Sequence, residues 1–476
     1  MKSNLSWLFI LFSLGGCTVG PDYRETVPTL PDHWQASKDA NTELAAIDKE
    51  ALKNWWQSFD DTKLNQLMDQ ALAGNLDLKI ALARIDQARA ERRGTRAELF
   101  PTVNVKAGVQ RQENPLPALA PGIRYNMFEL GFDALWEIDL FGRQQRRLEA
   151  ASADLEAANE AYQQSQVTLT AELARSYVDY RSLQNQLRIT RSNLETQQHT
   201  LALTEKLFKE GVVARHEVFR SRALTETTMS QIPALEARLT GSLRQLEVLV
   251  GRHPGTLAIS LQELGAVPQA PGKPLLASPA ATIRNRPDLR IAERHLAAAT
   301  AMQGAAIAEL FPKISLSAFL GLRNTDIESL FKSAAFSYGT AANLLQPLLN
   351  FGRIRAGIDL AEARQKEAYF AYEKAVLEAL QETETAMTRY LNEEIRRQML
   401  VRSAEDLRES VRLSQLRYEE GVISFLDVLD AQRSLYAAEI ELARSEAEAS
   451  TNLIAVYKAL GGGINPIASP KLSLEN

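Results

Sequence analysis

Few side chains in this 476-residue chain are placed to do chemistry. The five histidines are scattered without close pairing, and a single cysteine leaves no CxxC metal site and no intramolecular disulfide. The sequence contains no GxSxG, GxxxxGK[ST] or HExxH motif. We therefore expect no enzymatic activity, no cofactor and no metal site. The lone Cys17 is the residue whose position indicates a covalent modification.

Cys17 stands at the end of a short targeting signal. One lysine precedes an apolar stretch at 5–14, and two glycines lie directly before the cysteine. This order is typical of a secretory signal with its cut site. The stretch is too short for a spanning helix, which takes about 20 residues. We predict that residues 1–16 are the signal peptide.

The segment around the cysteine resembles the lipobox of bacterial lipoproteins. That resemblance implies a diacylglycerol and an acyl lipid on Cys17 as the new first residue. Thr18 stands where an aspartate would retain a lipoprotein on the inner membrane, which implies the outer membrane. The alternative is an ordinary signal peptide with a chance cysteine.

Charge and hydropathy exclude further classes of protein. The chain carries 54 Lys and Arg against 59 Asp and Glu, a formal net charge of -5, which argues against a broad nucleic-acid footprint. Hydrophobic residues make up 45% and charged residues 24%, as in folded proteins. No later run is long and apolar enough for a transmembrane helix, so further membrane contact requires strands, interfacial helices or lipid.

The chain is internally duplicated. Residues 97–101 and 308–312 both read Ala-Glu-Leu-Phe-Pro, an offset of 211. Phe-Gly-Arg at 141–143 returns at 351–353, and Glu-Gly-Val at 210–212 returns at 420–422, both offset by 210. Landmarks in one order at a near-constant offset predict two copies of one fold. We assign a lipidated N-terminal segment, two repeats joined near the proline-rich stretch 267–287, and a tail, with bounds of 17–64, 65–266, 267–466 and 467–476.

Long helices dominate each repeat. Proline is absent from 122–232 and from 348–465, and both windows are rich in helix-favouring residues. Leucine and tyrosine recur every seven residues from Leu148 onward, which predicts coiled-coil packing. Pro233 should bend or interrupt its helix. The expected helices span 65–98, 142–209, 214–250, 275–309, 352–419 and 424–460.

Between the helices the hydrophobic period changes to two. Four strands are expected, at 101–113, 126–139, 312–323 and 335–346, each of a length that suits a tilted membrane-spanning strand. A half-buried sheet in a soluble protein remains the alternative. Four strands cannot close a barrel, so spanning strands would have to be pooled from several copies. Glu129, Asp133 and Glu137 alternate with the apolar face and would line a lumen, giving modest cation preference.

At these residues the sequence resembles the TolC-type outer-membrane efflux channels, in particular the lipidated OprM-type (NodT) branch. The resemblance covers nearly the whole chain and rests on the start at Cys17–Tyr23, the block Trp55, Trp56, Phe59 and Asp61–Leu64, the paired Leu-Phe-Pro and Phe-Gly-Arg steps, and Arg417, Tyr418, Gly421, Val422, Leu426 and Leu429–Gln432.

The resemblance implies an α+β membrane protein. It would be a homotrimer with a twelve-stranded outer-membrane β-barrel, four strands from each chain, continuous with a periplasmic α-helical coiled-coil barrel. Its partners would be a periplasmic membrane-fusion adaptor, an inner-membrane pump of the RND type and outer-membrane lipid. It would passively conduct drugs or other small toxic compounds.

Two groups of site residues follow from the same resemblance. The turns between long helices would contact the adaptor through Gly211, Val212, Val213, Gly421, Val422 and Ile423, although they could be helix caps only. The gate motif falls on Arg417, Leu426 and Asp430, where three acids around one pore would repel or bind a cation. The offset of 210 places Arg220 at the position equivalent to Asp430, and we take it as a candidate charge complement.

Two other functions stay open. A periplasmic coiled-coil lipoprotein acting as scaffold or adaptor would also use long hairpins, but it would need one hairpin and no paired strands. A type I protein-secretion exit duct shares the channel architecture.

Overall fold

The computed structural model describes residues 18–25, 30–35, 52–113, 124–269 and 278–464. The chain forms two compact units. One contains the strands and the adjoining helix segments of 83–159 and 290–374, and the other contains the remaining helices. Cys17 and the predicted signal peptide lie outside the described residues.

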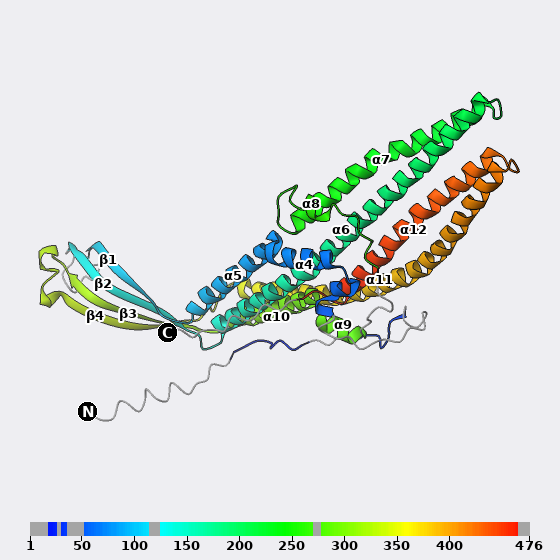
Figure 1. The fold of residues 1–476 in the computed structure, drawn as a ribbon. Coiled ribbons are helices and arrows are strands. Elements are labelled where there is room, and N and C mark those ends of the chain that lie inside the picture. Colours follow the sequence, from blue (N-terminus) through cyan, green and yellow to red (C-terminus); the bar gives the residue numbers. More distant parts are fainter. Residues whose placement is uncertain (1–17, 26–29, 36–51, 114–123, 270–277, 465–476) are drawn as a thin grey trace. The chain divides into compact units, whose positions relative to one another are not determined.

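The strand unit is built on one antiparallel sheet of order β1-β2-β3-β4 (Figure 1). Its strands are β1 (Thr102–Glu113), β2 (Arg124–Ile138), β3 (Lys313–Asn324) and β4 (Phe336–Leu345). Two 3-10 turns, η4 (Ile327–Ser329) and η5 (Ser333–Ala335), precede β4. β1 and β4 are the edges, and each has a partner on one side only among the described residues.

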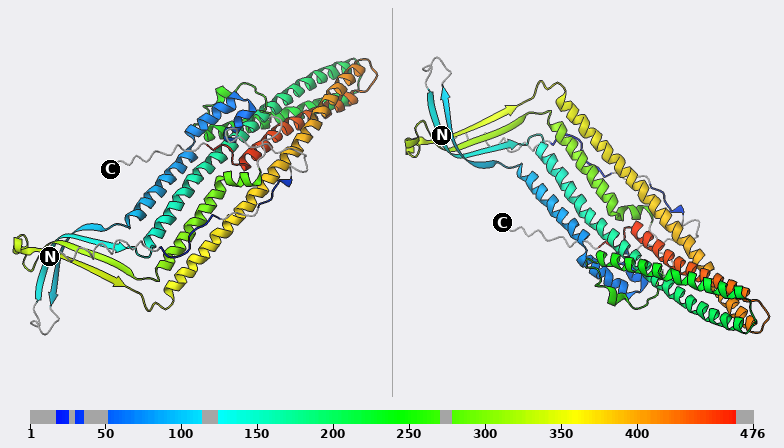
Figure 2. Two further views of the ribbon diagram at one scale, coloured as in Figure 1. Left: turned by 90° about the horizontal axis from the view of Figure 1, so that it is seen from below. Right: turned by 90° about the horizontal axis from the view of Figure 1, so that it is seen from above.

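The long helices continue from the strands. The helical elements are η2 (Trp55–Phe59), α4 (Thr62–Gly74), α5 (Leu76–Ala97), α6 (Arg143–Lys209), α7 (Arg215–Leu249), α8 (Ala258–Leu261), α9 (Pro279–Asn285), α10 (Pro287–Ala308), α11 (Arg353–Glu419) and α12 (Phe425–Ala459). In the strand unit α5, α6, α10 and α11 lie side by side in the order of the strands to which they connect (Figure 2). Among the described residues, none of the helices combines the length and the hydropathy that a membrane-spanning helix requires.

The two repeats have the same strand register. In the first hairpin Val103 lies opposite Ala134, and in the second Ile314 lies opposite Leu344. The offsets of 211 and 210 convert one pair into the other. The predicted duplication and four-stranded fold class are therefore confirmed in three dimensions.

Two predicted helices are each divided in the structure. Asn75 ends α4, and its side-chain oxygen accepts the backbone N–H groups of Asp77 and Leu78, so it caps α5 at 2.9 and 3.1 Å. At the equivalent place in the second repeat, α10 begins at Pro287, whose fixed φ suits a first helical position. The expected single helices over 65–98 and 275–309 are therefore wrong.

Pro233 does not interrupt its helix. α7 runs unbroken from Arg215 to Leu249 with this proline inside it. Of the bend or interruption expected at Pro233, the interruption is not observed, and the bend stays a prediction.

The helical unit has one large apolar core. Trp55, Tyr177 and Leu453 are almost fully buried in it, and Trp55 stacks on Tyr457 at 5.2 Å between ring centroids. Each repeat contributes its last helix to this core. The two helical hairpins also contact each other directly, because Tyr436 on α12 donates to Gln231 on α7 at 2.7 Å.

Candidate functional site

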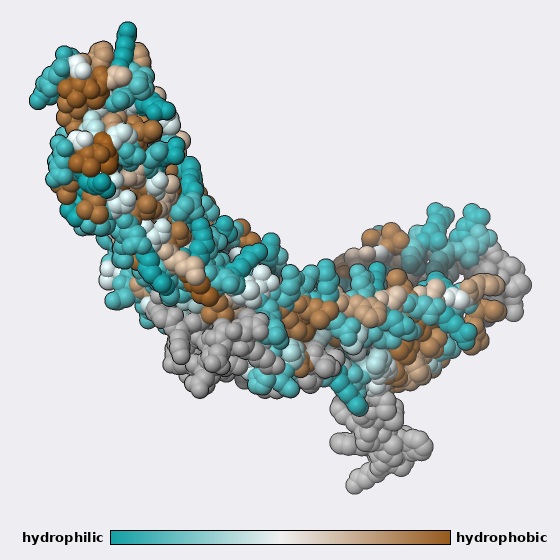
Figure 3. Space-filling model, turned by 90° about the vertical axis from the view of Figure 1, so that its right-hand side faces the viewer, coloured by the Kyte–Doolittle hydropathy of each residue, from teal (hydrophilic) through white to brown (hydrophobic). Residues whose placement is uncertain are grey.

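The sheet register separates an apolar face from a polar face. Val105 lies opposite Phe132, Phe132 opposite Leu320, and Leu320 opposite Tyr338. Several of these apolar side chains are more than half exposed in the single chain, and Figure 3 shows exposed apolar side chains among hydrophilic ones. An apolar face that runs across all four strands is what contact with lipid requires.

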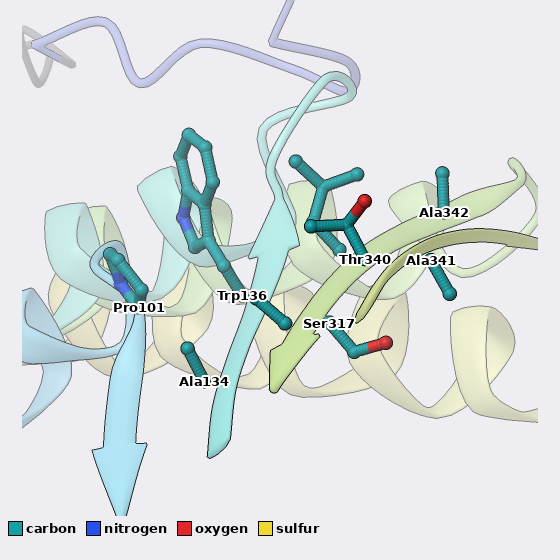
Figure 4. A pocket seen from close by; sticks show the side chains of 9 residues that line it. Pro101, Ala134, Trp136, Ser317, Thr340, Ala341 and Ala342 are labelled. Carbon is teal, nitrogen blue, oxygen red and sulfur yellow. The ribbon is translucent and has the colours of Figure 1, made fainter. Parts of the chain in front are cut away.

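Small side chains leave a depression on this apolar face. Ala134, Ala318 and Thr340 follow one another across three strands, with Trp136 in the neighbouring row (Figure 4). The resulting pocket has a volume of about 340 Å³. The indole N–H of Trp136 is satisfied by the carbonyl of Leu99 at 2.9 Å. The pocket therefore presents a mostly apolar wall.

The polar face contains the three predicted lumen acids, and two of them are neutralised. Glu129 is 8% exposed and pairs with Lys106 at 2.6 Å and with Arg323 at 3.4 Å. Glu137 pairs with Arg143 at 2.7 Å. Asp133 has no ion pair among the described residues. The basic partners Lys106 and Arg323 also lie on the polar face of their strands, as alternation in the sequence indicates. Only the strand register shows that both lie next to Glu129.

The strand-to-helix junction is tightly held. Arg143 reaches Glu309 at 3.3 Å as well as Glu137, and Phe141 stacks on Phe311 with ring centroids 4.7 Å apart. These contacts join the end of β2 to the residues that precede β3. They fasten the first repeat to the second where the polypeptide passes from strand to helix.

The segment after Cys17 is anchored at this junction. The backbone N–H of Val19 donates to the carbonyl of Phe141 at 3.2 Å. Thr18 packs so closely on Gly142 that a Cβ there would lie 2.6 Å from its methyl group. Arg146, 3% exposed, binds Asp22 at 2.7 Å. No sequence pattern predicts this contact, here called the clamp, because its partners are more than 120 residues apart.

Both tip turns have the same backbone. Gly211 and Gly421 take left-handed φ angles of 76° and 73°. Val212 and Val422 then donate to carbonyls five residues back, at 2.9 and 2.8 Å. This is the glycine-ended helix stop that satisfies otherwise free carbonyls. Val212 and Val422 are 67% and 57% exposed, while Val213 and Ile423 are half-buried.

The predicted gate residues lie close to the second tip. Arg417 is in the last turn of α11 and is exposed. Leu426 is 45% exposed, and Asp430 pairs with Arg433 at 3.5 Å. Among the described contacts within one chain, no ion pair joins Asp430 to Arg220 or Arg417. A pair between copies stays a prediction.

The helix that begins at the first tip, α7, contains a buried carboxylate with defined partners. Burial alone would raise the pKa of Glu247, but the backbone N–H groups of Leu257 and Gly255 and the guanidinium of Arg244 lower it. Burial raises the pKa of Tyr418 at the second tip, and so does Glu217 beside it. No group of three or more His, Cys, Asp or Glu side chains suited to a metal occurs in the described part of the chain.

Comparison with known proteins agrees with this architecture. The family "Outer membrane efflux protein" matches residues 67–252 and 279–462. Nodulation protein T of Rhizobium leguminosarum bv. trifolii is 31% identical over 471 residues, covering 98% of each chain. The solvent efflux pump outer membrane protein SrpC of Pseudomonas putida is 31% identical over 478 residues, covering 97% of this chain and 99% of its own.

The solved structure of the outer-membrane channel OprN superposes with a TM-score of 0.88 at 37% identity, covering 94% of this chain and 99% of that one. Together with the sheet and the hairpins, these similarities define the class: a non-enzymatic outer-membrane channel that extends into the periplasm. The chain belongs to the outer membrane efflux protein family. It is the outer-membrane component of a tripartite efflux system, which implies adaptor and inner-membrane pump partners.

Proposed function

We propose that three copies of this chain pool their strands into one closed barrel and export small toxic compounds such as drugs or solvents. The observation that carries this proposal is the continuous register that puts apolar side chains on one face and polar side chains on the other. Lipid does not tolerate open sheet edges, so β1 and β4 each need a strand from another copy. Twelve strands make a lumen wide enough for small molecules.

The direction of the apolar face can be tested by a matched pair of substitutions. Val105→Lys puts a charge on the proposed lipid face, where such a charge costs about 2–4 kcal/mol near the membrane centre. Asn104→Lys puts the same charge on the proposed lumen face. We expect loss of folded protein from outer-membrane fractions for the first variant only. Equal losses for both would contradict the assignment of faces.

The lipid anchor belongs to the same proposal. Lipid on Cys17 would enter the membrane next to the strand-to-helix junction, because Thr18 packs on Gly142. Cys17→Ser should abolish incorporation of labelled palmitate while leaving the strands able to insert. Retention of the label by this variant would contradict the anchor.

The tip turns are proposed to bind the adaptor, and the gate is proposed to lie at Arg417, Leu426 and Asp430. The exposure of Val212 and Val422 supports the first role. The Asp430 side chain is 60% exposed and its pair with Arg433 is long, at 3.5 Å, so its carboxylate can also face a cation or a base on another copy. Reversal of both charges in Arg220→Asp/Asp430→Arg should restore the resistance to leakage that either single variant loses. Additive leakage would contradict the Arg220 pairing.

The pump and the cargo are proposed from relatives. One relative is named for solvent efflux, another for cation efflux and another for pyoverdine export. A passive duct leaves selectivity to the pump, and we propose a pump of the RND type. With Glu129 and Glu137 paired, Asp133 remains the acid that would give the lumen a cation preference. Expression in an efflux-deficient host with candidate pumps would test the assignment through drug and solvent tolerance.

A further inference from the structure

The strand-to-helix junction repeats within the chain at the level of single hydrogen bonds. Trp136 donates to the carbonyl of Leu99 at 2.9 Å in the first repeat. Its equivalent, Gln346, donates to the carbonyl of Leu310 at 3.1 Å in the second. The side chains differ, yet donor position and acceptor position correspond through the same offsets of 210 and 211. The backbone acceptor and the side-chain donor of this hydrogen bond are therefore placed alike in the two junctions.

A second set of contacts joins the first repeat to the second. Phe141 stacks on Phe311 with an interplanar angle of 22°, and Arg143 pairs with Glu309. These contacts accompany the pairing of β2 with β3. They connect the first repeat to the second at the edge where β2 pairs with β3.

The residues equivalent to this set are exposed and lack these contacts at the two edges of the chain. Phe351 is 98% exposed and Phe100 is 59% exposed. Arg353 is exposed and makes no ion pair with any described residue, while Glu98 meets Arg147 only at 3.8 Å. Phe351 also has a φ of 48°, which bulky residues rarely adopt, whereas its packed equivalent Phe141 does not.

We propose that Phe351 and Arg353 of one copy bind Phe100 and Glu98 of the next copy, in the way that Phe141 and Arg143 bind Phe311 and Glu309 within the chain. The partner is a second copy of this chain, since only it presents the required Phe-Pro step beside an unpaired strand edge. This inference rests on the proposed pooling of strands and specifies its contact.

If the contact between copies repeats the contact within the chain, the strand register between copies follows from the register of β2 and β3. Within the chain Ala134 on β2 lies opposite Ala318 on β3. Adding 210 to the first and subtracting 211 from the second gives Leu344 on β4 opposite Ala107 on β1 of the next copy. A slip of one residue would turn the apolar side chains to the polar face. The register is therefore a definite prediction.

The contact is expected at the junction and the strands rather than along the helices. Within the chain Glu156 on α6 pairs with Arg294 on α10 at 2.8 Å. Their equivalents are Lys366 and Ala83, which cannot form this pair. Instead α11 exposes Leu360 and Phe370, at 52% and 63%. The helical edges must therefore pack differently from α6 and α10, while the junction residues Phe, Arg, Glu and Phe are retained.

Cysteine cross-linking in outer membranes tests the register. The full-length double variant Ala107→Cys/Leu344→Cys should form disulfide-linked dimers and trimers on mild oxidation. Cys17 is kept in every sample, and the two single variants measure its background. A control, Val105→Cys/Leu344→Cys, keeps both cysteines on one face but two residues out of register, and it should cross-link far less.

Charge exchange tests the junction contact. Arg353→Glu and Glu98→Arg should each lower the fraction of heat-resistant trimer in detergent, and the double exchange should restore it. Phe351→Ala should weaken association about 3- to 10-fold per interface, the range for an aromatic pair. The matched variant Phe141→Ala acts inside one chain and should instead lower the stability of the folded monomer.

The outcomes separate this inference from the proposed function. Trimers that cross-link at the control register, or a double exchange that fails to restore them, would overturn the inference while leaving the pooled barrel intact. Folded monomers with no cross-link at either register would overturn both. Cross-linking at Ala107 and Leu344 with recovery in the double exchange would establish the contact.

Discussion

The last helices of the two repeats, α7 and α12, end at equivalent residues, and different side chains bind their terminal carbonyls. In the first repeat the amide of Asn75 donates to the carbonyl of Leu249 at 2.9 Å. In the second repeat the guanidinium of Arg286 donates to the carbonyl of Ala459, also at 2.9 Å. The backbone geometry has been kept and the side chain has changed. The fold therefore requires a hydrogen-bond donor to the carbonyl at the helix end, and this donor can be a neutral amide or a charged guanidinium.

The charged version creates dependence on further partners. Arg286 also binds Asp288 and Glu382, each at 2.7 Å, and Lys458 approaches Glu382 at 3.2 Å. Burial alone would lower the pKa of Arg286, but these carboxylates raise it. The second repeat therefore has a buried guanidinium with partly exposed charged partners where the first has a capping amide.

Removal of the donors Asn75 and Arg286 should show the largest difference in stability between the two repeats. Arg286→Ala takes the guanidinium away from the Ala459 carbonyl and the Asp288 carboxylate, and we expect a loss of about 2 kcal/mol in the free energy of unfolding. Asn75→Ala should cost about 1 kcal/mol, as loss of a helix cap does. Urea unfolding followed by circular dichroism measures both. Equal losses would show that the charged partners of Arg286 add nothing.

Acid should act on the first repeat through Glu247. Its lowered pKa means that it stabilises the fold above the ordinary value of 4.5 and that this stability is lost as the pH falls further. Glu247→Gln should cost about 2 kcal/mol at neutral pH, since buried N–H groups lose a charged acceptor. It should also flatten the pH dependence of stability below 4.5. Glu226→Gln, an exposed acid on the same helix, is the control and should change neither quantity.

The two tips differ more modestly. At the second tip Asp427 accepts the backbone N–H and the hydroxyl of Ser424 at 3.0 and 2.7 Å, whereas Ala214 at the first tip offers no side chain to its helix start. Ser424→Ala should cost about 0.5–1 kcal/mol, and Ala214→Ser should gain less than that. Hydrogen exchange of the tip amides should become faster in the first variant and slower in the second. No change in either variant would mean that the turns are held by packing instead.

Packing at the tips follows the same asymmetry. Phe425 is 4% exposed and lies 5.5 Å from the ring of Tyr418, so the second tip has an aromatic pair. The equivalent residues at the first tip are Arg215 and Phe208, and Phe208 is 40% exposed. The aromatic residue Phe208 at the first tip is therefore more exposed, whereas Phe425 at the second tip is buried against Tyr418.

Much of the fold could be predicted from the sequence because its periods are long and regular. The change from helical period to alternation located the four strands, and the offset of 210 to 211 identified their pairing into equivalent hairpins. The break at Asn75 was missed because apolar spacing continues across it. The break before Pro287 was visible in the proline itself.

The candidate site was less accessible to sequence reasoning. Glu129 could be assigned to the polar face from alternation, but Lys106 and Arg323 become its neighbours only when three strands are brought into register. Likewise the clamp of Arg146 on Asp22 joins residues whose distance in sequence hides their contact. Long-range ion pairs carry no periodic signal, and this is why they escaped prediction.

In the proposed function, pooled strands form a pore and the tip of the second repeat gates it. Single-channel conductance of the purified oligomer in planar bilayers tests both parts, with wild type beside Asp430→Ala and Asp430→Ala/Leu426→Ala. We expect a pore in all three, open more often or more widely in the variants. A pore unaffected by both variants would remove the gate from this tip. The absence of a pore from well-folded oligomer in every sample would contradict the channel and favour a periplasmic scaffold.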